Sequence, residues 1–161
     1  MCIRDRLGVF GGFERAVELG AAAPALRGEV LFQEAWLRFR AGEFNAAATA
    51  FLRLYEKHPT AEKAGDALFW AAESYYQVGD LDSGQSLLKQ YQRAFPGGDH
   101  AAAAHYALGW IHFRREQYEG AIREFGAYLR VAPANSPYRR DARLRLADSH
   151  YAAKRLSLIH I

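Results

Sequence analysis

The fold is decided by the stretch HAAAAHYALGWIHFRREQYEGAIREFGAYLRVAP, which runs from His100 to Pro133. Its first half carries apolar residues at the three- and four-residue spacing of an amphipathic helix, and the half that begins at Tyr118 does the same. The polar residues EQY interrupt the pattern between the two halves. Pro133 lacks a backbone N–H and disfavours helical geometry in the residue before it, so the second helix has to end there. The stretch therefore predicts two helices joined by a tight turn.

The same pattern returns along the chain with one period. Pro59, Pro96 and Pro133 are separated by 37 residues each time. The same interval of 37 separates the turn residues Gly42, Gly79 and Glu116. It also separates the small residues Ala35, Ala72 and Gly109, and the next small residue, Ala147, follows after 38. Because three residue classes share one period, we interpret the chain as an array of helix pairs.

The repeats predict an all-α protein, an α-solenoid of antiparallel helix pairs. We expect helices at 11–21, 28–41, 44–58, 61–78, 81–94, 100–115, 118–131 and 138–154. They form full repeats near 28–60, 61–97 and 100–134, with partial repeats at 9–21 and 138–155. Gly42 and Gly79 fit the left-handed position that closes a helix, and Glu43 and Asp80 suit the start of the next one.

The two ends of the chain differ in character from the repeats. The residues MCIRDR at 1–6 and LSLIHI at 156–161 resemble translated sequencing-adapter remnants, so we expect both to be non-native and residues 7–155 to form a single repeat domain. The chain would then be a fragment, and the lack of a signal peptide would say nothing about its compartment. The cytoplasm and the cell envelope both stay open.

Composition argues against several classes of function. The chain has 21 basic and 18 acidic residues, and acids are interspersed even in its most basic stretch, YRRDARLR at 138–145, so we expect no nucleic-acid partner. No apolar run reaches the roughly 18–20 residues that span a bilayer, and no direct membrane contact is expected. Cys2 is the only cysteine, which excludes an internal disulfide and a cysteine-based metal site.

No motif of catalysis is present. The sequence lacks a GxSxG elbow, a P-loop and a Cys/His pair placed to activate a nucleophile. A minimal zinc site could be formed by His105, His112 and Glu116, but the residues around them do not match an HExxH motif. The more favoured interpretation of His112 is that it packs in the position where other repeats have an aromatic residue. We therefore expect no enzyme activity, no cofactor and no metal.

The repeats resemble the tetratricopeptide repeat (TPR). The third repeat carries the family pattern best, at Leu108, Gly109, Tyr118, Ala121, Phe125 and Pro133. The first offers Ala35, Gly42, Phe44, Ala47, Phe51 and Pro59, and the second offers Ala72, Tyr75, Gly79, Gly84, Leu88 and Pro96. The departures from the family are the period of 37, Glu116 in place of a turn glycine, and His112 and His150 where aromatics are common. The junction FPGGDHAAAAHYALGW resembles repeats of bacterial envelope proteins, including the Tol-Pal-associated periplasmic protein and the BamD-like lipoprotein of outer-membrane assembly, and this favours a periplasmic or envelope location.

The resemblance implies a right-handed superhelix whose concave face is lined by the first helix of each repeat. The family's inward positions form four columns, which hold Phe32, Phe69 and Tyr106 in the first, Trp36, Glu73 and Trp110 in the second, Phe39, Tyr76 and Phe113 in the third, and Arg40, Gln77 and Arg114 in the fourth. The partial repeat at 138–155 adds Leu144, Asp148 and Tyr151. Aromatics in the first and third columns can serve packing or binding. Trp36 and Trp110 are expected to face a ligand, or alternatively to cover a gap between splayed repeats.

The expected function is non-catalytic protein–protein interaction. Some TPR proteins bind the terminal carboxylate of a peptide with a clamp of lysine and asparagine side chains. The corresponding positions hold other residues here, so binding of a peptide or helix along the groove is a better interpretation than capture of a terminal carboxylate. The chain would belong to a larger protein of envelope assembly or maintenance. One alternative is the helical, non-catalytic arm of a larger enzyme such as a lytic transglycosylase, and another is self-association through exposed apolar ends.

Overall fold

The computed structural model describes residues 24–159, with side chains described for 27–155. The predicted helix at 11–21, the partial repeat around it and the segment 1–6 lie outside the described residues, as do residues 160–161.

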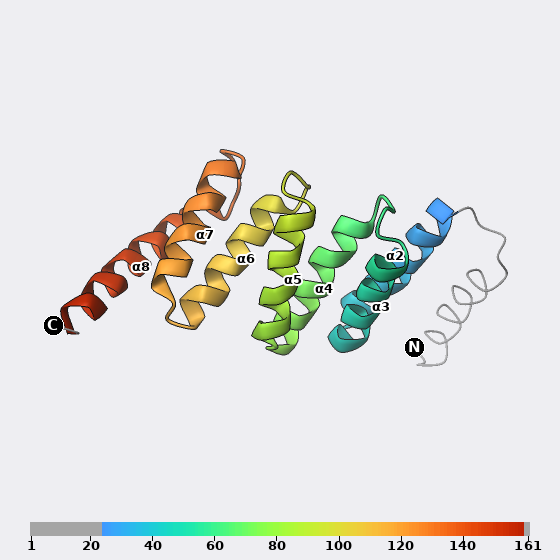
Figure 1. Ribbon diagram of the computed structural model, residues 1–161, viewed down its shortest axis with the longest axis horizontal. Helices are drawn as coiled ribbons and strands as arrows, with labels where there is room; N and C mark the ends of the chain where they lie inside the picture. Colours follow the sequence, from blue (N-terminus) through green and yellow to red (C-terminus); the bar gives the residue numbers. More distant parts are fainter. Residues whose placement is uncertain (1–23, 160–161) are drawn as a thin grey trace. The chain divides into compact units, whose positions relative to one another are not determined.

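The described residues form seven helices and no strand (Figure 1). Their bounds are α2 Pro24–Arg40, α3 Phe44–Lys57, α4 Ala64–Val78, α5 Leu81–Ala94, α6 Ala101–Arg114, α7 Tyr118–Val131 and α8 Arg139–Ile159. The predicted ranges of α5 and α7 coincide with these bounds. Helix α2 begins at Pro24, earlier than predicted. Proline is favourable at the first position of a helix, because a backbone N–H there would have no hydrogen-bond partner within the helix. Helix α8 continues past residue 154 to Ile159.

The chain divides into two compact units, with the boundary between Leu87 and Leu88 inside α5. In unit 1, α3 packs against both α2 and α4, and in unit 2, α7 packs against both α6 and α8. Within each unit, neighbouring helices lie side by side and run in opposite directions (Figure 1). We call α2, α4, α6 and α8 the first helices of their repeats, and α3, α5 and α7 the second helices.

The turns between the helices of a repeat have left-handed backbone. Gly42 and Gly79 have φ angles of 80° and 84°, as the sequence predicted for helix-closing glycines. Glu116 takes the third turn position with a φ of 57°. A side chain in this region costs roughly 1 kcal/mol or more, so the turn at Glu116 is held by its surroundings, including the hydrogen bond from Gln117 N to His112 O of 2.9 Å. Asp80 caps α5, since its carboxylate accepts the N–H of Ser83 at 3.1 Å.

Small residues stand where the helices of a repeat cross. Ala35, Ala47, Ala72 and Ala121 are fully buried, and Gly84 and Gly109 are buried as well. A Cβ atom on Gly109 would lie 2.7 Å from the ring of Phe125, which itself is fully buried. Ala147 is the exception. It is exposed, because α8 has no second helix after it among the described residues.

The crossing of α6 and α7 provides a matched pair of substitutions. Gly109→Ala is expected to lower the free energy of unfolding by about 1–3 kcal/mol, because Phe125 has no room to move in a filled core. Gly126→Ala should instead raise it by up to about 1 kcal/mol through helix propensity, since a Cβ atom there meets only the flexible end of Arg130, at 3.8 Å. Urea unfolding followed by circular dichroism measures both, and equal effects of the two variants would contradict the close crossing.

Candidate functional site

The first helices of unit 1 form an aromatic cluster. Trp36 and Phe39 of α2 lie with their rings nearly parallel, 5.5 Å apart between centroids. Trp70 of α4 meets Trp36 and Phe39 edge-on, at 4.5 and 5.2 Å. Phe69 is buried, and its ring centroid lies 5.5 Å from that of Trp70, whereas Phe32 is buried against Phe51 of α3. Trp36, Phe39 and Trp70 stay partly exposed.

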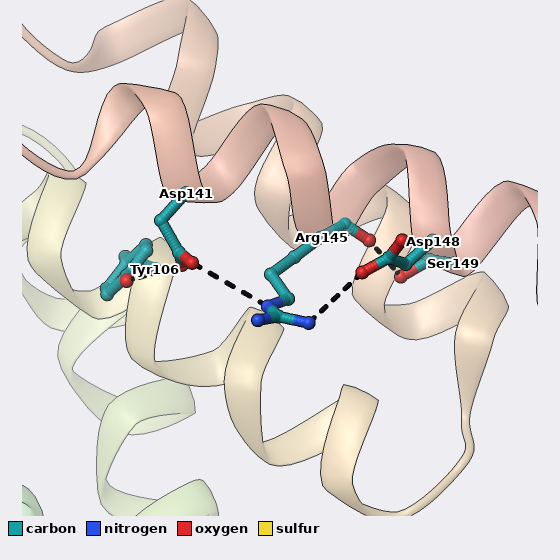
Figure 2. Close-up of polar contacts among 5 residues, drawn as sticks. All are labelled: Tyr106, Asp141, Arg145, Asp148 and Ser149. Atoms are coloured by element: carbon teal, nitrogen blue, oxygen red, sulfur yellow. Dashed lines mark hydrogen bonds and ion pairs between the residues drawn. The ribbon is translucent and has the colours of Figure 1, made fainter.

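The corresponding cluster in unit 2 combines aromatic rings with an arginine. The ring centroids of Trp110 and Phe113, on α6, are 5.9 Å apart. The Arg145 guanidinium of α8 lies 4.9 Å from the centroid of Trp110 and 5.5 Å from that of Phe113, within the range of cation–π attraction. Arg145 also reaches Asp148 at 3.0 Å and Asp141 at 3.6 Å, so two carboxylates of its own helix compensate its charge (Figure 2).

Trp70 and Arg145 are residues of this surface that the sequence analysis missed. They occupy the same repeat position, which Ala107 fills in the third repeat. In both units the residue at this position covers the tryptophan of the preceding first helix. The 37-residue period could have revealed the equivalence, but the four inward columns taken from the TPR resemblance do not include this position.

Tyr106 connects α6 to α8. Its hydroxyl donates a hydrogen bond to Asp141 at 2.8 Å, and its ring lies 5.2 Å from that of Tyr128 and 5.1 Å from that of Tyr138. Burial, together with the neighbouring Asp141 carboxylate, raises the pKa of Tyr106 to about 12. The hydroxyl therefore remains a neutral donor at physiological pH, and Tyr106 serves to attach the two helices to each other.

Three polar members of the predicted site are exposed to solvent. Arg40, Gln77 and Arg114 are exposed, and Gln77 donates a hydrogen bond to Glu73 at 2.9 Å. Tyr76 is partly buried in unit 1. The structure thus brings the predicted residues of unit 1 to the first helices α2 and α4, and those of unit 2 to α6.

The two histidines considered for a metal site have separate partners. His105 contacts Glu124 of α7 through Nδ1 at 2.8 Å, whereas Nδ1 of His112 contacts Gln117 at 2.7 Å. His112 is buried, and its ring lies so close to Gly120 that a Cβ atom there would be 2.7 Å from it. Over the described residues, no group of three or more histidine, cysteine or acidic side chains is arranged to hold a metal ion.

Glu124 joins three helices of unit 2. Its carboxylate accepts hydrogen bonds from His105 of α6 and from Gln92 of α5, the latter at 3.2 Å. Burial opposes the charged form, but these hydrogen bonds outweigh it and hold the pKa of Glu124 below its ordinary value of 4.5. Elsewhere in unit 2, a hollow of about 440 Å³ lies between the end of α6, the start of α7 and Ala153 of α8.

Comparison with known proteins identifies the fold and a family. The YfiO family, described as outer membrane lipoprotein, matches residues 24–159. BtubC (BKLC) from P. vanneervenii superposes with a TM-score of 0.72 at 16% identity, over 94% of this chain and 69% of that one. TPR-like repeats assigned to a kinesin light chain of Podosopora anserina superpose with a TM-score of 0.68 at 12% identity, over 92% of this chain and 79% of theirs. No curated protein matches the sequence.

These similarities confirm the predicted fold class, an all-α solenoid of TPR-like helix pairs. They also confirm the resemblance to BamD-like envelope lipoproteins that the junction before α6 indicated. Across residues 24–159, none of the helices combines the length and apolar character that a bilayer crossing requires.

The hydrogen bonds of Glu124 make stability depend on acidity. Because the folded-state pKa lies below the unfolded one, the stabilisation is present above about pH 4.5 and is lost as pH falls through the folded pKa. When the pH is lowered from about 6 to about 3, the free energy of unfolding should decrease less for Glu124→Gln than for the wild type. Urea unfolding across this range measures the difference, with the exposed Glu56→Gln as control. Parallel pH profiles for the wild type and Glu124→Gln would contradict the assignment.

Proposed function

Because the chain belongs to the YfiO family of outer membrane lipoproteins, we propose that it is a non-catalytic scaffold for protein–protein interaction. In this proposal a partner peptide or helix binds the first helices of the repeats, α2 and α4 in unit 1 or α6 and α8 in unit 2. The chain would act within a larger bacterial protein of envelope assembly or maintenance.

The partly exposed aromatic rings on the first helices carry the proposal. Trp36, Phe39 and Trp70 in unit 1, and Trp110 and Phe113 in unit 2, keep part of their rings accessible after packing. Large rigid rings bury much area on binding and lose little side-chain entropy, which is why they dominate the energetics of protein interfaces. The structure also fixes these rings in advance through ring–ring and cation–π contacts, so a partner would meet a preorganised surface.

The same tryptophans have a packing role. Trp36 contacts Trp70, and Trp110 contacts Arg145, so each one helps to join consecutive first helices. Packing on one edge of a ring leaves its other surface available for binding. The two roles proposed from the sequence, contact with a ligand and covering the junction between repeats, are therefore compatible in one side chain.

Removing both tryptophans tests the binding face. Short random peptides displayed on phage serve as the probe, and selected peptides are then measured against purified protein. Trp36→Ala combined with Trp110→Ala is expected to raise the dissociation constant by about tenfold or more, the effect of losing an interface hot spot. Tyr55→Ala, which removes a partly buried aromatic side chain from the second helix α3, should leave it unchanged.

Stability is measured in parallel, because both tryptophans also pack. Circular dichroism has to show the same helix content in the double variant as in the wild type. If the alanine variant unfolds, Trp36→Phe with Trp110→Phe replaces it, since a smaller ring keeps the helix junctions while reducing the accessible area. Unchanged affinity in a folded double variant, or the recovery of no binding peptide at all, would overturn the proposed function.

The envelope role has its own test. An epitope-tagged protein, expressed from its own gene in the source organism, is expected to fractionate with the cell envelope, in keeping with the match to an outer membrane lipoprotein family. Recovery in the cytoplasmic fraction, with a known envelope protein and a known cytoplasmic protein as markers, would contradict the envelope assignment while leaving the scaffold proposal open to the peptide test.

A further inference from the structure

One face of α6 packs against α7, the second helix of the same repeat in unit 2. The ring of Tyr106 lies 6.1 Å from that of Phe125 between centroids, and the backbone at Gly109 approaches Phe125 so closely that a Cβ atom would lie 2.7 Å from its ring. One turn further on, the ring centroids of Phe113 and Tyr118 are 6.0 Å apart. The apolar part of this helix pair therefore consists of rings on both sides of one close crossing.

Two histidines complete this face of α6 with polar contacts to α7. Nδ1 of His105 lies 2.8 Å from the carboxylate of Glu124, and Nδ1 of His112 lies 2.7 Å from the side-chain oxygen of Gln117. The ring of His112 also packs on Gly120, where a Cβ atom would lie 2.7 Å from it. The side that α6 turns to α7 is thus formed by His105, Tyr106, Gly109, His112 and Phe113.

Helix α8 carries the equivalent side, and there it is exposed. The equivalent residues, each 38 positions further along the chain, are Arg143, Leu144, Ala147, His150 and Tyr151, and we call them the exposed face of α8. Leu144 and Tyr151 are 53% and 67% exposed, which is unusual for large apolar side chains. Together with Ala147 they follow the three- and four-residue spacing of an amphipathic helix that packs on a neighbour.

Charge limits what can cover this face. The two acids of α8, Asp141 and Asp148, both lie beside Arg145, so their charges are compensated within the helix (Figure 2). The exposed charged side chains of α8 up to residue 155 are all basic, namely Arg140, Arg143, Lys154 and Arg155. Two copies of α8 placed face to face would bring like charges together, whereas a helix with acidic residues beside its apolar stripe complements them.

Helix α7 shows which residue pattern fits such a face. Ala121, Glu124 and Phe125 follow Tyr118 by three, six and seven positions, so they share one side of the helix. The position that His105 occupies opposite Glu124 holds Arg143 in α8, where a permanent positive charge would meet the carboxylate.

The alanine of the exposed face is compatible with a phenylalanine in the covering helix. In repeat 1 the crossing residue is Ala35, and it shares a core cluster with Phe51, the equivalent of Phe125. Ala147 stands at the same repeat position as Ala35. The pattern of α7 can therefore be applied to α8 although its crossing residue has a methyl group.

We propose that the exposed face of α8 binds an amphipathic helix of a partner protein, and that this helix has the pattern of α7, with an acidic residue opposite Arg143. The bound helix would take the place that a second helix has in the other repeats. Neither tryptophan of the aromatic clusters belongs to this face, so the inference goes beyond the proposed function and does not depend on it.

A synthetic peptide with the sequence of residues 117–131 serves as the probe. It carries Gly126→Ala, which favours the helical state and meets only the end of Arg130. The peptide is labelled at its N-terminus and titrated with the whole chain, and binding is followed by fluorescence anisotropy. Saturable binding of one peptide per chain is expected. Ala147→Leu should abolish it, because a close crossing has no room for a branched side chain, and this exposed position leaves the fold intact.

A charge exchange tests the register of the bound helix. Arg143→Glu is expected to raise the dissociation constant by about tenfold, and Glu124→Arg in the probe should restore binding to this variant. Glu119→Arg in the probe changes an exposed position of α7 and is the matched control, which should not restore binding. Arg53→Glu, at an exposed position of α3 in the protein, should bind the unmodified probe like the wild type.

The remaining outcomes overturn the proposal. No saturable binding of the probe, or equal binding by the wild type and Ala147→Leu, excludes a helix on the exposed face of α8. Restoration by Glu119→Arg as well as by Glu124→Arg excludes the register. Dimers in sedimentation that Ala147→Leu dissociates show that a second copy occupies the face. A longer polypeptide of the same gene that no longer binds the probe shows that the chain covers the face with its own segment, and this overturns a partner protein as the occupant.

Discussion

The close crossing of the two helices in a repeat is the constraint on which the remaining structure depends. At Gly109 the backbone of α6 approaches the ring of Phe125 so closely that even a methyl group would not fit. The fully buried alanines at the corresponding places in the other repeats show the same requirement. Because this crossing fixes the rotation of each first helix about its axis, it also decides which side chains turn away from the second helix. The aromatic clusters with Trp36 and Trp110 are the consequence of that rotation.

Sequence periodicity predicts the parts of the structure that local chemistry determines. A left-handed glycine, a proline that ends a helix and a small residue at a crossing each have one geometric reason, and the reason recurs with the repeat. Glu116 shows how far this extends. Its place in the period indicated a turn position, and the backbone is left-handed there although the residue is not glycine. The repeat overrides the local preference of the side chain because the helices on both sides of the turn are fixed by packing.

The composition of the candidate surface was harder to predict, since it depends on which residues of consecutive first helices meet. Positions transferred from the TPR family identified Trp36 and Trp110 but not Trp70 and Arg145, which cover them. An arginine pairing with two carboxylates of its own helix is indistinguishable in sequence from an ordinary charged helix face. Only the contact between α6 and α8 shows that the guanidinium lies on an aromatic ring.

The alternation of repeat types gives the solenoid a property that a uniform array lacks. In an array of identical repeats, every junction between first helices would offer the same surface, and a peptide could bind in several registers. In this chain a tryptophan is followed by an acidic residue at the corresponding position of the next repeat, in both units. A peptide that binds beside a tryptophan would therefore not meet the same surface one repeat further along. The crossing of the helices, in contrast, is the same in every repeat and maintains the scaffold.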